Sequence, residues 1–195
     1  MVIEGDGVIL RPIVLDDMLS LQRWDDDPEI TSLVGKKFLH PERSLAWFHR
    51  ARHASECLAL AIVDRASGTL VGDVELEDIS WRSGRAELRI CIGEKRYWGQ
   101  GYGTDAIRAF MNYAFANTSL KHIFLRVYTS NRRAIACYKK CGFRPEAVLR
   151  VGRRRQGFSE DLLLMTLDKQ TTSGRAMTLH HESVPRQQPI RTKAG

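Results

Sequence analysis

The sequence lacks long hydrophobic runs. Of its 195 residues, 43% are hydrophobic and 27% are charged. No stretch approaches the roughly 18 uninterrupted apolar residues that a membrane-spanning helix needs. The first residues carry acids ahead of a short apolar run, without the basic segment and cleavage site of an export signal. We therefore expect a cytoplasmic protein with no membrane partner.

Cysteine is also scarce, and the spacing of the four cysteines fits no disulfide framework. They lie in apolar or helical contexts, which predicts reduced thiols: Cys57, Cys91, Cys137 and Cys141. Cys137 and Cys141 are one helical turn apart, but a zinc site would need two more ligands, and no histidine lies at metal-ligand spacing from them. The sequence therefore predicts no metal.

Basic residues outnumber acidic ones, 30 to 23, which gives a formal net charge of +7. Two basic blocks stand out, Arg150–Arg155 and the segment 170–195. Neither block is interleaved with aromatic residues in the manner of a nucleic-acid groove, so we do not expect a nucleic-acid partner. A coenzyme with several phosphates would also suit a positive cleft.

Strand and helix patterns alternate along the chain. Alternating or β-branched runs predict strands, and apolar residues at helical spacing predict helices. The predicted strands are Val8–Pro12, Cys57–Asp64, Leu70–Ile79, Arg85–Ile92, His122–Tyr128, Phe143–Arg150 and Phe158–Leu167. The predicted helices begin at Asp16, as an N-cap, and at Pro41, and cover Gly103–Asn117 and Asn131–Cys141.

This order predicts an α/β fold with a central twisted mixed sheet of about six to seven strands and helices on both faces. An acidic turn, Asp25–Glu29, ends the first helix, and a hairpin turn lies at Ala66–Thr69. Residues 1–169 would form one domain. Residues 170–195 have no periodicity and are rich in Ser, Thr, Gln and Pro, which predicts a disordered tail.

A glycine-rich segment, GQGYGT (Gly99–Thr104), lies between a predicted strand and a predicted helix. Its alternating glycines permit positive φ and expose backbone N–H groups, and the helix that follows aims its positive end at the same point. This combination binds phosphate, although a tight strand-to-helix connection has the same pattern. The Gly-Lys-Ser/Thr of a Walker A loop is absent, and the Gly-x-Gly-x-Gly spacing does not fit a dinucleotide fingerprint.

A second segment, NRRAIACYKKCGFRPE (Asn131–Glu146), follows about 30 residues later. Together the two segments resemble the GNAT superfamily of N-acetyltransferases, most closely the subgroup that contains the ribosomal-protein N-terminal alanine acetyltransferases and the spermidine acetyltransferases. The resemblance covers roughly Val8 to Asp168. The family's Gln/Arg-x-x-Gly-x-Gly/Ala loop fits in two registers, from Arg96 or from Gln100. In the second register, Asp105 stands where the superfamily has a small residue.

The resemblance implies a sheet splayed between the fourth and fifth predicted strands, with the acyl arm of acetyl-CoA in the gap. It implies that Asn131 hydrogen-bonds the pantetheine arm and that Tyr138 protonates the departing thiolate. Glu87 would deprotonate the amine, although its position also suits a surface glutamate. The implied donor-binding residues are Ile90, Cys91, Ile92, Tyr97, Trp98, Gly99, Gln100, Gly101, Tyr102, Gly103, Thr104, Asn131, Ala134 and Tyr138.

We therefore expect an N-acetyltransferase that moves an acetyl group from acetyl-CoA to a primary amine of a small molecule, a polyamine or a protein N-terminus. The acidic turn Asp25–Glu29 either attracts a cationic acceptor or is a solvated helix end. Transfer of another acyl group, such as succinyl, and a non-catalytic acyl-CoA sensor stay open as alternatives. A homodimer is a further expectation, because dimers are common among similar proteins.

Overall fold

Eight strands form one mixed sheet in the part of the chain that the structure describes. The computed structural model describes residues 1–35, 42–53, 55–150 and 161–169. The strands are β1 (Ile3–Glu4), β2 (Val8–Pro12), β3 (Leu58–Asp64), β4 (Leu70–Ser80), β5 (Arg85–Ile92), β6 (His122–Tyr128), β7 (Arg144–Leu149) and β8 (Leu162–Asp168). Their order across the sheet is β1-β2-β3-β4-β5-β6-β8-β7, and only β5 and β6 pair in parallel.

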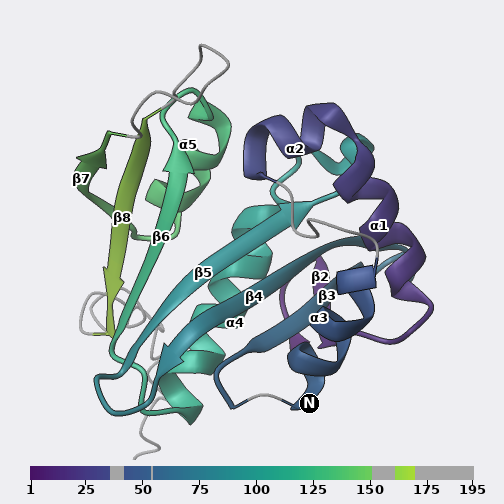
Figure 1. The fold of residues 1–195 in the computed structure, drawn as a ribbon, viewed down its shortest axis with the longest axis horizontal. Helices are drawn as coiled ribbons and strands as arrows, with labels where there is room; N and C mark the ends of the chain where they lie inside the picture. The colour runs from purple at the N-terminus through teal and green to yellow at the C-terminus, as the bar shows by residue number, and fades with distance from the viewer. Residues whose placement is uncertain (36–41, 54, 151–160, 170–195) are drawn as a thin grey trace, which may run out of the picture.

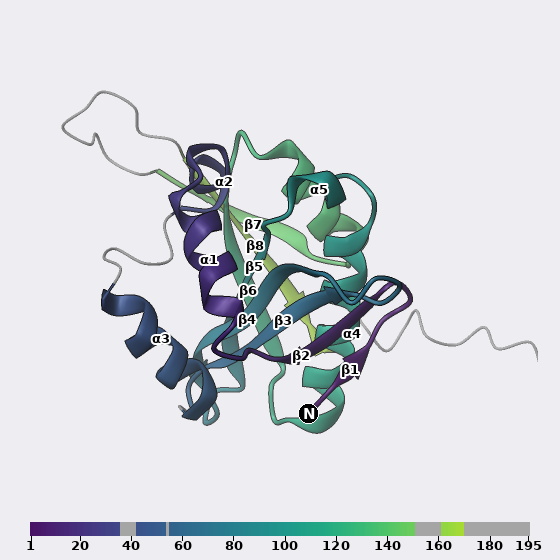
Figure 2. The same cartoon turned by 90° about the vertical axis from the view of Figure 1, so that its right-hand side faces the viewer.

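Helices cover both faces of this sheet (Figures 1 and 2). They are α1 (Asp17–Asp26), α2 (Pro28–Val34), α3 (Glu42–His53), α4 (Tyr102–Asn117) and α5 (Arg132–Lys140). α1, α2 and α3 lie on one side, and α4 and α5 lie on the other (Figure 2). Within the described ranges, no helix is long and apolar enough to cross a membrane.

Each face has its own apolar cluster, which follows from the period-2 alternation of the strands. Phe110 and Met111 of α4 pack in the larger cluster with residues of β2 to β6, and both are almost fully buried. Trp24 of α1 and Trp47 of α3 pack in the smaller cluster with alanines of β3. The small side chains of β3 let the helices approach the sheet closely.

The predicted fold class is confirmed, and so are the glycine turn at Ala66–Thr69 and the Asn131 cap of α5. Gly68 has φ +70°, and the Asn131 Oδ1 atom accepts a hydrogen bond from the Ala134 N–H at 3.1 Å. The additional strand is β1, whose two residues are too few to show a pattern. The described part of the predicted last hairpin forms β7 and β8. The basic turn between them and the predicted tail lie outside the described residues.

Two predictions about the N-terminal helices need correction. Asp16 is the N-cap residue of α1, as predicted, but its side chain makes no capping hydrogen bond; instead Asp17 accepts from the Val14 N–H at 2.8 Å and pairs with Arg11. The segment predicted as an acidic turn contains the start of a separate helix, α2. Asp27 caps it by accepting from the backbone N–H of Glu29 at 2.9 Å, and proline occupies its first turn.

The sheet opens between β5 and β6. The two strands pair only from Arg85 opposite His122 to Glu87 opposite Phe124. β5 then continues to Ile92 beside β4, whereas β6 continues beside β8. Figure 1 shows the two strands diverging toward α2 and α5. This is the splay that was predicted between the fourth and fifth strands, which are β5 and β6 once β1 is counted.

Candidate active site

The glycine loop forms an open backbone surface at the start of α4. Gly99 and Gly101 have φ +75° and +93°, and an added Cβ atom at either position would meet nothing within 4 Å. Gly101 is the N-cap of α4 and supplies no side chain to the first turn. Among the described residues, no group is seen to accept from the N–H groups of Tyr102, Gly103 or Thr104. Exposed N–H donors at the positive end of a helix form an anion site.

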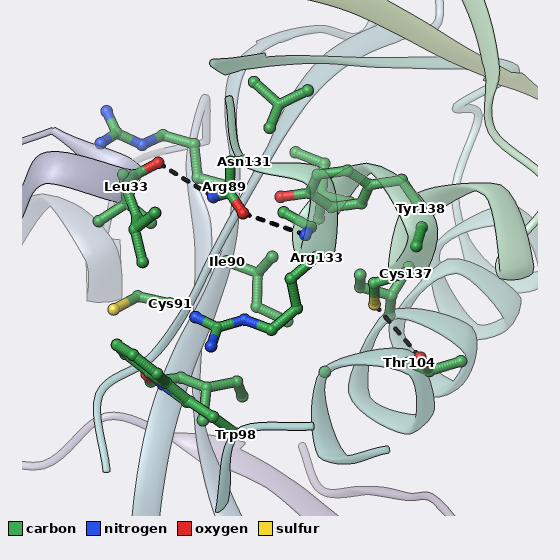
Figure 3. A pocket seen from close by; sticks show the side chains of 18 of the residues that line it. Leu33, Arg89, Ile90, Cys91, Trp98, Thr104, Asn131, Arg133, Cys137 and Tyr138 are labelled. Carbon is green, nitrogen blue, oxygen red and sulfur yellow. Dashed lines mark hydrogen bonds between the residues drawn. The ribbon is translucent and has the colours of Figure 1, made fainter. Parts of the chain in front are cut away.

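A cavity of about 450 Å³ joins this loop to the splay between β5 and β6 (Figure 3). Its walls are the second half of β5, the glycine loop, α5 and the end of α2. Of the predicted site residues, only Gln100 does not line it, because its side-chain amide turns back to donate to the Arg96 carbonyl. The structure therefore brings together both segments that carried the prediction.

Asn131 joins the two helices that border the cavity. Its Oδ1 atom caps α5, and its Nδ2 atom donates to the Leu33 carbonyl of α2 at 3.3 Å. Asn131 is 6% exposed. A single amide side chain thus fixes the start of α5 relative to the end of α2, on opposite sides of the cavity mouth.

Tyr138 lies deeper in the cavity and is 8% exposed. Its ring packs edge-on against Phe143, with centroids 6.0 Å apart. Figure 3 shows its hydroxyl pointing inward, and no described residue is seen to hydrogen-bond it. Burial raises the pKa of the phenol above its ordinary value, so the hydroxyl stays protonated. A buried hydroxyl that points into a cavity is available to a ligand.

Glu87 is buried rather than a surface glutamate. It lines the cavity at 4% exposure, and the guanidinium of Arg126 on β6 grips both of its oxygens, with Nε at 2.8 Å and Nη2 at 2.5 Å. The pair spans β5 and β6 just where they part. Arg126 was not singled out from the sequence, because it is 39 residues away from Glu87 along the chain.

A row of carboxylates on β4 continues from Glu87 beneath α1 and α2. Asp73, Glu75 and Glu77 alternate along β4 and lie opposite Cys91, Arg89 and Glu87 of β5, respectively. Arg89 approaches Glu77 at 3.4 Å. Burial and the neighbouring carboxylates of Glu75 and Glu87 raise the pKa of Glu77, against the opposing effect of Arg89. The alternating acids of DVELED were visible in the sequence, but which face they share became clear only from the sheet.

The acidic segment Asp25–Glu29 divides between two roles. Asp27 and Glu29 pair with Lys95, which precedes the glycine loop, at 2.8 and 2.6 Å. Asp25 is buried and lines a small cavity together with Asp73 and Glu75. Part of the segment is therefore neither solvated nor a simple helix end, and the attraction of a cationic acceptor stays a prediction.

Asp105 explains the departure from the small residue of the family pattern. Its carboxylate accepts three backbone N–H groups of the turn between β1 and β2: Asp6 at 3.0 Å, Gly7 at 2.7 Å and Val8 at 3.0 Å. Gly5 faces the same carboxylate so closely that an added Cβ would lie 2.7 Å from it. The acid is thus an anchor that holds α4 to the N-terminal hairpin.

Two side-chain contacts at the start of α4 were not predicted from the sequence. Asp64 accepts a hydrogen bond from the Tyr102 hydroxyl at 3.0 Å, which holds the first residue of α4 to the end of β3. Cys137 lies 3.2 Å from the Thr104 hydroxyl. A hydrogen bond with the Cys141 thiol lowers the pKa of Cys137 most, and that with Thr104 lowers it less; against the opposing effect of burial, the pKa falls to about 7. As predicted, all four cysteines are free thiols.

Comparison with known proteins identifies the class to which this fold and site belong. The family described as Acetyltransferase (GNAT) domain matches residues 8–144. The chain therefore belongs to the GNAT acetyltransferase family. At this level, the predictions of an acyltransferase, of acetyl-CoA as donor and of an amine-bearing acceptor are confirmed.

Two relatives and one solved structure illustrate what the chain is similar to. The chain is 29% identical over 148 residues to the spermidine N(1)-acetyltransferase of Escherichia coli K12, covering 75% of this chain and 77% of that protein. It is 23% identical to the uncharacterized N-acetyltransferase p20 of Bacillus licheniformis, covering 87% and 97%. The crystal structure of spermidine N-acetyltransferase from Vibrio cholerae, in complex with CoA and spermine, has the same fold, with a TM-score of 0.78, 22% identity, and 87% and 99% coverage.

Proposed function

We propose that this protein transfers the acetyl group of acetyl-CoA to a primary amine of a small polycation, such as a polyamine. The observation that carries the proposal is the meeting of two unlike walls. The first wall is the anion site at the start of α4, which lines the cavity. The second is the row of carboxylates on β4 and β5: Glu87 lines the same cavity, and Asp73 and Glu75 line a smaller cavity that shares residues of β5 with it. A phosphate-bearing donor suits the first wall, and a cationic acceptor suits the second.

The residues present fit acetyl-CoA. The exposed N–H groups at the start of α4 would hold its diphosphate, and Asn131 would bind the pantetheine arm. Among the described residues, no strand pairs with β5 from Ile90 to Ile92 on the β6 side, so the backbone groups of this edge would pair with the arm and with the thioester oxygen. The thioester supplies the activated acyl group. The protein's task is to orient it and to move protons.

Glu87 is the candidate for removing the proton of the ammonium group. A primary alkylamine has an ordinary pKa of ~10.4, so at neutral pH it is almost wholly in the ammonium form. The ammonium group cannot attack until it loses a proton. Glu87 is the one carboxylate among the described residues that line the cavity. Arg126 keeps it oriented toward the splay.

Tyr138 would stabilise the departing thiolate through a hydrogen bond. A thiol has an ordinary pKa of ~8.5, so its thiolate is less basic than a phenolate, and burial raises the pKa of Tyr138 further. Complete proton transfer from the phenol to sulfur is therefore uphill. The hydroxyl acts as a fixed donor, and solvent protonates the thiolate after release.

The acceptor follows from the charge on β4. Glu75, Glu77 and Glu87 lie close together on paired strands, so a cation that reaches this row would be attracted to it. Burial raises the pKa of Glu77 most, and the carboxylates of Glu75 and Glu87 add to the effect of burial, against that of Arg89. The relatives named for spermidine acetylation support the same class. A protein N-terminus presents only one ammonium group, so it uses less of this surface. The predicted homodimer remains a proposal that light scattering tests.

An amine panel tests the proposal, with release of the free CoA thiol as the readout. Spermidine and spermine should give higher kcat/KM than an aminoglycoside, a simple monoamine or an N-terminal peptide. Glu77→Gln should reduce this preference and leave the KM for acetyl-CoA unchanged, whereas Glu146→Gln, on the exposed strand β7, should change neither. A peptide that outperforms every polyamine would refute the acceptor class.

The catalytic roles have separate tests. Tyr138→Phe should leave CoA binding intact and lower kcat about tenfold or more, because one charge-assisted hydrogen bond is lost. Glu87→Gln should lower kcat and make it less dependent on pH. Unchanged turnover in either variant would remove that residue from the mechanism.

A further inference from the structure

Arg133 spans the donor cavity. It is the second residue of α5, and its guanidinium lies 3.9 Å from the centre of the Trp98 ring. Trp98 is fixed in turn, because its Nε1 atom donates to the Ile92 carbonyl at 2.6 Å. Figure 3 shows Arg133 reaching from α5 across to Trp98. The contact joins α5 to the residue directly before Gly99.

The flat face of the Arg133 guanidinium stacks on Trp98, which leaves the N–H groups of its edge available to a ligand. Arg11, Arg89 and Arg126 each pair with a carboxylate, whereas no carboxylate within the described ranges is seen to pair with Arg133. Stacking on an aromatic ring uses the flat face of the group and leaves five N–H donors around the rim. Such a rim binds phosphate oxygens in a bidentate manner.

The position of the rim selects which phosphate it meets. Trp98 precedes Gly99, and the glycine loop leads directly into the exposed N–H groups of α4. Arg133 therefore lies across the cavity from the helix end that would hold the diphosphate. Two kinds of donor, backbone N–H and guanidinium, then face one anion from opposite walls.

We infer that Arg133, held flat by Trp98, binds the diphosphate of the donor. The inference rests on the proposed function, because it takes acetyl-CoA as the donor. It adds a side chain of α5 to the anion site at the start of α4, and it makes Trp98 a positioning residue.

The binding of three ligands tests it: CoA, 3′-dephospho-CoA and pantetheine, measured by calorimetry with competition for the weakest. Arg133→Gln should weaken CoA and dephospho-CoA about tenfold or more and pantetheine less than about twofold, since only the first two carry the diphosphate. Arg132→Gln is the matched control, because it removes the same charge from the exposed neighbouring residue of α5. It should weaken CoA binding less than about twofold.

Three results would overturn the inference. Equal losses in both arginine variants would mean general electrostatics, and no loss in Arg133→Gln would mean no contact. A loss for CoA but not for dephospho-CoA would move the contact to the 3′-phosphate. Failure of the unaltered protein to bind CoA at all is distinguishable from these, and it would refute the proposed donor itself.

The role of Trp98 is tested by combining substitutions. Trp98→Leu should weaken CoA binding when Arg133 is present and have little further effect in the Arg133→Gln background. Equal effects in both backgrounds would show that Trp98 does not act through Arg133. Urea unfolding of each variant, with an unchanged midpoint expected, separates loss of binding from loss of fold.

Discussion

Replacing Asp105 with alanine should destabilise the protein by about 3 kcal/mol. Within the described residues, every hydrogen bond that this carboxylate is seen to accept comes from the backbone. Its carboxylate accepts from Asp6, Gly7 and Val8. Val8 is fully buried, so its N–H would lose its partner without access to water, which costs about 1–3 kcal/mol. Asp6 and Gly7 are exposed, so water replaces part of each bond and the cost is roughly 0.5–1 kcal/mol each.

Asparagine at the same position gives an internal comparison. The Oδ2 atom of Asp105 serves both Gly7 and Val8, and Oδ1 serves Asp6. The single carbonyl of an asparagine can keep the first two bonds, so Asp105→Asn should lose only the Asp6 bond, roughly 0.5–1 kcal/mol, against about 3 kcal/mol for Asp105→Ala.

Urea unfolding followed by circular dichroism measures these differences, and the alanine variant should also melt about 6–12 °C lower. Asp16→Ala is the control, because Asp16 is exposed and caps nothing, and it should cost less than about 0.5 kcal/mol. A loss below about 1 kcal/mol for Asp105→Ala would refute the anchoring role.

Three other predictions follow from the structure, two on glycine substitutions and one on thiol alkylation. Gly101→Glu and Gly101→Ala share the strain of φ +93°, about 1–2 kcal/mol, but only the glutamate should abolish CoA binding in a thermal-shift titration, since its charge opposes phosphate. Gly93→Ala places a Cβ 1.9 Å from the buried Trp24 ring and should cost about 1–3 kcal/mol or more in urea unfolding, whereas Gly68→Ala, with nothing within 4 Å, should cost only left-handed strain. Alkylation of Cys137 should rise through pH 7, because its pKa is about 7 and the thiolate reacts; CoA should protect it, and a rise only above pH 8 would contradict the lowered pKa.

The cavity-lining residues of the glycine loop and of α5 were recognisable in the sequence because their signals are local. The glycines of the loop and the Asn131 cap act within a few residues, so their spacing is sufficient. Asp105 and Arg126 act on partners 97 to 99 and 39 residues away, and no local pattern records such contacts. α2 is different: Asp27 followed by Pro28 is a helix start, but its position among acids favoured a turn.

β5 explains how one short strand can serve donor and acceptor together. Its side chains alternate, so Leu88, Ile90 and Ile92 pack toward the α4 cluster while Arg89 and Cys91 face the helices of the other side. Its free edge beyond Glu87 leaves a third direction, along the sheet, for the acyl arm. A shift of one residue in the register with β4 would exchange the two faces, placing apolar side chains among the carboxylates. In the proposed function, the pairing with β4 is therefore what would hold the acyl group beside the row of carboxylates.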